Sequence, residues 1–98
     1  MTETTKLDIA EELETEEDIR AFLEASFEEA GNDTDSAAIV HALGIAARAR
    51  GFVKIAASTG LDRAGLYRSF SRNGDPKIST VCKVAESLGY RLAVIPTR

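Results

Sequence analysis

The sequence has few of the residues that build covalent or metal-based sites: one cysteine, one histidine and no tryptophan. A single cysteine, Cys82, excludes a disulfide within the chain, and one cysteine with one histidine supplies too few ligands for a structural zinc site. We expect Cys82 to be a small buried residue. His41 has no nucleophile partner, so we expect it to be structural or exposed. Neither a glycine-rich phosphate loop nor a Ser/His/Asp set occurs, and we expect neither an enzyme nor a cofactor.

Long apolar runs are also missing. No run approaches the ~20 residues that a membrane span requires, and the first residues are acidic, which argues against a signal peptide. We therefore expect a cytoplasmic protein. The 98 residues allow one domain with a modest core. Aromatic residues make up only 6% of the chain, so aliphatic residues and alanine must build the core, and this composition favours an all-α fold.

The net charge of -4 conceals an uneven distribution along the chain. Residues 1–35 carry thirteen acidic and two basic residues, whereas residues 36–98 carry three acidic and ten basic ones. This division indicates two partners of opposite charge, or one partner and masking of the protein's own basic surface. Solvated helix faces would give the same counts. The acidic residues lack the oxygen-ligand pattern of a calcium loop, so we expect no metal site.

Apolar spacing predicts six helices, over residues 7–13, 15–30, 36–50, 53–59, 63–71 and 79–88. Thr15 with Asp18 three residues later is a variant of the capping box, and Asp62 and Ser79 are expected N-caps. The tail after Gly89 predicts a short strand, with Tyr90, Leu92 and Val94 as its interface. A lone strand lacks a partner within the domain. We expect it to pair with its copy in a dimer, or with an extended segment of another protein.

The stretch IAASTGLDRAGLYRSF, residues 55–70, has the pattern of a helix-turn-helix. Ala56 is small where the second helix would cross the first, and Gly60 suits the turn. Ile55, Leu61 and Leu66 are expected to be buried at this crossing.

With those apolar residues turned inward, the second helix would present its basic and small residues outward. Arginine binds guanine O6 and N7 bidentately, and small residues allow close approach to base edges. The predicted base-reading residues are Arg63, Ala64, Gly65, Tyr67 and Arg68. The predicted phosphate contacts are Lys54, Arg72, Asn73, Lys77 and Ser79.

Residues 52–89 resemble the Xre/Cro-type, lambda-repressor-like helix-turn-helix in the small residue Ala56, the Gly60-Leu61 turn, the loop Pro76 and the closing Leu88-Gly89. The whole chain resembles the probable addiction module antidote family of HigA-like antitoxins. This resemblance rests on FLEASFEEA, GIAARARG, TGLDRAGLYRSFS and NGDPKISTVCKVAESLGYRLAV. Ser69 departs from the family, which generally has an apolar residue there.

The resemblance implies a dimeric repressor of its own operon that neutralises a small basic toxin of the RelE/HigB/ParE kind. It implies an acidic helical extension over residues 1–35, a DNA-binding domain over residues 36–89 and a tail over residues 90–98. Opposite charges favour toxin contact by the acidic segment. The candidate toxin contacts are Glu11, Glu12, Asp18, Glu24 and Glu28.

Two alternatives from other classes stay open. A stand-alone Xre-type transcriptional regulator would bind DNA without a toxin partner. A protein-interaction module that has lost DNA binding would show no salt-sensitive, sequence-specific affinity for DNA.

Overall fold

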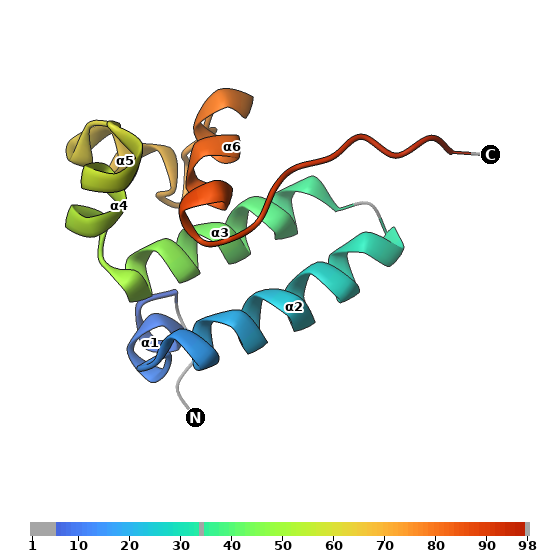
Figure 1. The fold of residues 1–98 in the computed structure, drawn as a ribbon, viewed down its shortest axis with the longest axis horizontal. Coiled ribbons are helices and arrows are strands. Elements are labelled where there is room, and N and C mark those ends of the chain that lie inside the picture. The colour runs from blue at the N-terminus through green and yellow to red at the C-terminus, as the bar shows by residue number, and fades with distance from the viewer. Residues whose placement is uncertain (1–5, 34, 98) are drawn as a thin grey trace.

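The computed structural model describes residues 6–33 and 35–97. Residues 1–5, 34 and 98 lie outside this described part of the chain, so the signal-peptide prediction, which concerns the first twelve residues, falls partly outside it. The six predicted helices are present (Figure 1), and they are α1 (Lys6–Glu12), α2 (Glu16–Asp33), α3 (Ser36–Arg50), α4 (Phe52–Thr59), α5 (Arg63–Ser69) and α6 (Ile78–Ser87). None of the helices in the described residues is long and apolar enough to cross a membrane.

The predicted capping box at the start of α2 is confirmed. The Thr15 hydroxyl accepts a hydrogen bond from the Asp18 backbone N–H at 3.0 Å, and the Asp18 carboxylate accepts one from the Thr15 N–H at 3.1 Å. The predicted end of this helix near Ala30 is wrong, because α2 continues to Asp33. A glycine costs a helix only about 1 kcal/mol relative to alanine. Ala30 is buried against the rest of the fold, and this packing sustains the last turn.

Helices α3 and α4 are joined by a single residue. Gly51 has a φ of 108°, ends α3 through a hydrogen bond from its N–H to the Ala47 carbonyl at 2.9 Å, and also precedes the first residue of α4. Helix α4 begins at Phe52, one residue earlier than predicted. Phe52 is 4% exposed, so burial fixes this end of the helix in place of a polar cap.

The ends of α5 and α6 also differ from the predictions. Helix α5 ends at Ser69, two residues early, because Phe70 turns into the core. Ser79 is not the N-cap of α6: the first helical hydrogen bond runs from the Val81 N–H to the Lys77 carbonyl, so α6 begins at Ile78 with Lys77 as its cap. Lys77 makes no side-chain capping hydrogen bond, so the sequence carries no capping signal at this helix start, whereas Ser79 is a favoured capping residue.

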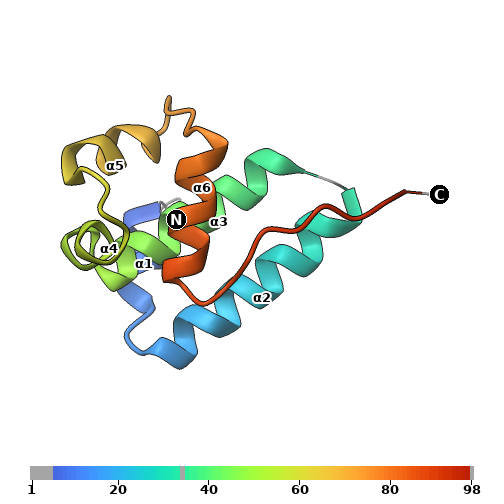
Figure 2. The same ribbon diagram turned by 45° about the horizontal axis from the view of Figure 1, so that its top comes forward.

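Helix α3 lies at the centre of the fold, with α1 and α2 against one side and α4 and α6 against the other (Figures 1 and 2). One hydrophobic core spans these layers, and it contains Ile19, Leu23, Ala42, Leu43, Ala46, Ala47, Phe52, Ile55, Leu66, Phe70, Val81, Val84, Ala85 and Leu88. Because Leu23 of the acidic segment is fully buried in this core, α2 is an integral layer. The division into units at residue 35 stays a prediction.

The C-terminal segment leaves α6 through Gly89, which has a φ of 93°. The Tyr90 N–H bonds the Ala85 carbonyl at 2.9 Å and the Gly89 N–H bonds the Glu86 carbonyl at 3.0 Å, which together form a Schellman motif. Residues 90–97 contain no strand, so the predicted strand is not confirmed. The segment is extended and runs toward the end of the molecule where α2 meets α3 (Figures 1 and 2).

Candidate nucleic-acid interface

The turn between α4 and α5, residues 60–62, is fixed by hydrogen bonds at both ends. Gly60 has a φ of 77°, and its N–H bonds the Ala56 carbonyl at 2.9 Å. At the other end the Asp62 carboxylate accepts the Gly65 N–H at 2.8 Å, which confirms Asp62 as the N-cap of α5. The Thr59 hydroxyl accepts the Leu61 N–H at 3.2 Å. The orientation of α5 against α4 is therefore set locally by the turn.

Apolar packing beneath the turn holds α4 and α5 against the core. Ile55 and Leu66 are 0% and 1% exposed, and Leu61 is half-buried against the same core. The predicted burial is confirmed for Ile55 and Leu66, whereas Leu61 is only half-buried. With this face of α5 buried, the opposite face is free to meet solvent.

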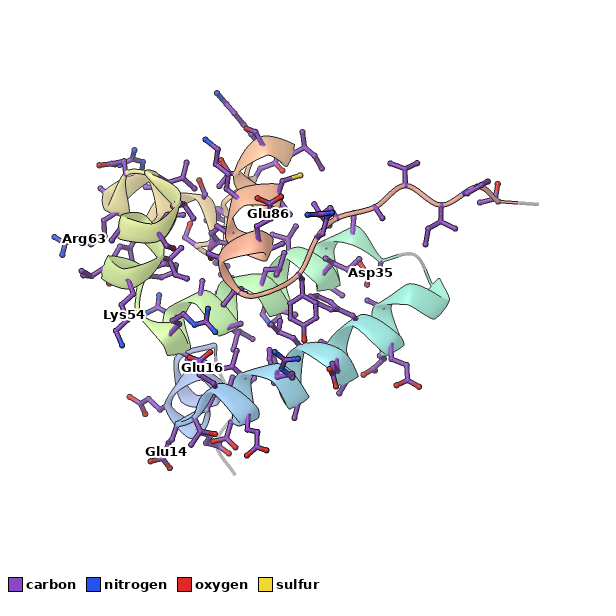
Figure 3. All side chains as sticks on the ribbon, viewed as in Figure 1. Glu14, Glu16, Asp35, Lys54, Arg63 and Glu86 are labelled. Atoms are coloured by element: carbon purple, nitrogen blue, oxygen red, sulfur yellow. The ribbon has the colours of Figure 1, made fainter. Side chains whose placement is uncertain are left out.

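The predicted base-reading residues lie on that opposite face. Arg63, Ala64, Tyr67 and Arg68 are exposed, and Gly65 is half-buried beside Asp62. Figure 3 shows Arg63 and Lys54 projecting from the same side of the molecule, from α5 and α4. These two cations thus come from separate helices and face the same side of the molecule.

The other predicted phosphate contacts follow α5 along the chain. Arg72, Asn73, Lys77 and Ser79 are all exposed, the first two in the loop after α5 and the others at the start of α6. Gly74 makes this loop tight, because a Cβ at this position would lie 2.2 Å from the Ser69 carbonyl oxygen. Its N–H bonds the Ser71 carbonyl at 2.9 Å. The loop carrying Arg72 and Asn73 is thereby held close to the end of α5.

Sequence reasoning missed a cluster formed by Arg48, Phe52 and Tyr67, one residue from each of α3, α4 and α5. The rings of Phe52 and Tyr67 are 4.6 Å apart between centroids and tilted by 60°. The guanidinium carbon of Arg48 lies 5.6 Å from the Phe52 centroid and 5.7 Å from the Tyr67 centroid. The four-residue spacing of Arg48 and Phe52 was visible in the sequence, but the approach of Tyr67 depends on tertiary packing.

Most of the candidate toxin contacts are open on the surface. Glu11, Glu12, Glu24 and Glu28 are exposed on α1 and α2. The Asp18 carboxylate instead accepts hydrogen bonds from the backbone of Glu14 and Thr15, which makes it a structural cap. Figure 3 shows Glu14 and Glu16 at the corner where α1 meets α2.

The remaining predicted positions have mixed surroundings. The Tyr90 ring packs edge-on against Phe27, with centroids 5.4 Å apart and planes at 84°. Of the other tail residues, Leu92 is 38% exposed and Val94 is 99% exposed.

Cys82 is half-buried, which is less than predicted, and His41 is exposed.

Comparison with known proteins identifies the family of this chain. Residues 3–96 match the family model described as "Probable addiction module antidote protein". The chain is also similar to a protein of Haemophilus influenzae named "Uncharacterized protein", with 38% identity over 99 residues that cover 100% of this chain and 98% of that one. No solved structure matches the chain significantly. The match over nearly the whole length shows that the chain belongs to the probable addiction module antidote family.

Proposed function

We propose that this protein is the antitoxin of a type II toxin–antitoxin pair and a sequence-specific repressor of its own operon. The observation that carries the DNA-binding part is the exposure of Arg63, Ala64 and Arg68 on one face of α5, while Leu66 on the other face is buried. In this proposal α4 and α5 form a helix-turn-helix, and α5 enters the major groove.

The charges around α5 suit such a complex. Arg63 and Arg68 can each read guanine through two hydrogen bonds, while Ala64 and Gly65 leave room for the base edges. Lys54, Arg72 and Lys77 would contact phosphates and set the register of the protein on the duplex. The acidic total charge of the chain does not oppose this, because the acidic residues are concentrated in residues 1–35.

The antitoxin part rests on family membership and on the acidic surface of α1 and α2. The partner would be a small basic toxin of the RelE/HigB/ParE kind, steered toward Glu11, Glu12, Glu24 and Glu28 by opposite charge. Because Leu23 of α2 is part of the common core, a toxin on this surface would bind the same packed domain that carries α5.

The protein would act on DNA as a dimer, because two half-sites about 34 Å apart give a two-fold protein two grooves to read. The tail, with Leu92 and Val94 exposed, is the proposed contact between the two copies.

The DNA-binding part is tested by titrating the purified protein against a duplex from the region upstream of its own gene, and against a shuffled duplex of equal composition. We expect a dissociation constant at least about 1,000-fold tighter for the upstream duplex, with affinity falling steeply as salt rises. Equal affinity for the two duplexes would contradict a sequence-specific repressor.

A further inference from the structure

Arg48 occupies an unusual position at the junction of α3, α4 and α5. Its guanidinium lies within 6 Å of two aromatic centroids, those of Phe52 at the start of α4 and Tyr67 on the outward face of α5. Aromatic faces attract a guanidinium and restrict its rotation. Arg48 is therefore drawn toward these two rings, beside the face that carries Arg63 and Arg68.

The hydrogen-bonding groups of Arg48 are not used within the protein. Among the described residues, Arg48 has no hydrogen-bond acceptor and no carboxylate in an ion pair, although a guanidinium offers five N–H donors. The side chain is half-buried, yet its nitrogen atoms keep access to solvent. Arg50, two residues along α3, differs because it pairs with Glu16 and donates to the Ser87 carbonyl.

A surface arginine with no partner normally moves freely, and ordering it on a ligand costs conformational entropy. The rings of Phe52 and Tyr67 pack against each other, and Arg48 lies against this ring pair, which reduces its rotational freedom before any ligand arrives. A planar, oriented guanidinium with open donors is well suited to bind phosphate oxygens.

We propose that Arg48 binds a phosphate of the DNA backbone at the edge of the groove that α5 enters. This inference rests on the proposed DNA-binding function and adds to it a contact from α3, outside the α4–α5 pair. Phe52 and Tyr67 act as the platform for this contact. Tyr67 then serves the complex by positioning Arg48, besides any contact of its own with a base.

The test compares Arg48→Gln, Arg48→Ala and Arg48→Lys with the wild type on the upstream duplex and on the shuffled duplex, across a series of salt concentrations. Arg20→Ala is the matched control, because it removes one exposed arginine from α2, away from α5. Thermal denaturation checks that each variant is folded. Arg48→Gln is the main variant, because it keeps a long stem and a planar end group.

We expect Arg48→Gln and Arg48→Ala to weaken binding about 5- to 10-fold on both duplexes, and to reduce the slope of log affinity against log salt by about 0.9. Arg48→Lys should restore most of the slope and part of the affinity, and Arg20→Ala should change neither. A folded Arg48→Gln with the affinity and slope of the wild type would overturn the proposal. So would a loss of affinity on the upstream duplex alone with an unchanged slope, which indicates positioning without phosphate contact. If the wild type itself binds neither duplex, the proposed DNA-binding function fails as well.

Discussion

Arg50, in the last turn of α3, forms an ion pair with Glu16 in the first turn of α2 and donates a second hydrogen bond to the Ser87 carbonyl at 2.5 Å. One side chain thereby joins α2, α3 and α6 through residues 34 and 37 positions away in the sequence. The Arg50 side chain is 22% exposed, whereas that of Glu16 is 72% exposed. The bond to the Ser87 carbonyl is part-buried and the bond to Glu16 is exposed, so solvent screens the second more strongly.

This difference predicts unequal effects of two substitutions on stability. Glu16→Gln should lower the free energy of unfolding by less than about 1 kcal/mol, because exposed ion pairs contribute little. Arg50→Ala should cost about 1–3 kcal/mol, because it also leaves the Ser87 carbonyl without its charged donor. Urea unfolding followed by circular dichroism measures both. Equal losses in the two variants would show that the bond to Ser87 contributes nothing.

Substitutions at Asp62 are expected to affect stability and DNA affinity separately. Asp62→Ala removes the acceptor for the Gly65 N–H and should lower the free energy of unfolding by about 1 kcal/mol. Asp62→Asn keeps a capping side chain and should leave stability nearly unchanged. It also removes a negative charge beside Arg63, so we expect tighter DNA binding. Tighter binding by Asp62→Asn in a gel-shift titration, with an unchanged melting temperature, checks the second part, and weaker binding would refute it.

Gly44 lies beneath Phe70 in the core. A Cβ at Gly44 would approach the Phe70 Cδ1 atom to 3.1 Å, so Gly44→Ala should destabilise the protein by about 1–3 kcal/mol through overpacking. Gly65→Ala is the matched control, because a Cβ at this position would come no closer than 3.4 Å to the atoms around it. Alanine also has a higher helix propensity than glycine. Chemical unfolding of both variants tests this, and a Gly44→Ala protein as stable as the wild type would contradict the packing.

Arg63 and Arg68 predict the base specificity of the complex. Arg63→Ala and Arg68→Ala should each cost about 1–3 kcal/mol at the cognate site and relax the preference at one base pair. Fluorescence anisotropy on a set of duplexes with single base-pair changes measures affinity and preference together. Unchanged affinity and preference in both variants would remove these arginines from the base-reading set.

We expect the C-terminal tail to be required for dimerisation. Removal of residues 92–98 leaves Tyr90 on Phe27, so the fold should persist while the dimer weakens and operator affinity falls with it. Sedimentation equilibrium before and after truncation measures this change. A truncated chain that sediments as the wild type would move the proposed dimer contact elsewhere.

The helices could be predicted from sequence wherever the signal was local. The Thr15–Asp18 capping box, the Asp62 cap and the turn at Gly60 are each encoded within four residues. The predictions failed where contacts between residues distant in sequence determine a helix end. Phe70 packs over Gly44 of α3, and α5 therefore ends earlier than predicted.

Some residues of the candidate site could likewise be predicted from the sequence, and others could not. The outward face of α5 could be predicted, because burial of Leu66 fixes the orientation of that helix. The position of Arg48 over Tyr67 could not, because it depends on how α3 meets α5.

The central claim is that this member of the antidote family is the partner of a toxin. Its most direct test is to express a tagged copy together with its neighbouring genes, purify it, and determine the intact masses of whatever is bound. The account predicts a stoichiometric complex with a small basic protein encoded by an adjacent gene. A chain that purifies alone, as a dimer that still binds its own upstream DNA, would contradict the antitoxin function and indicate a stand-alone regulator.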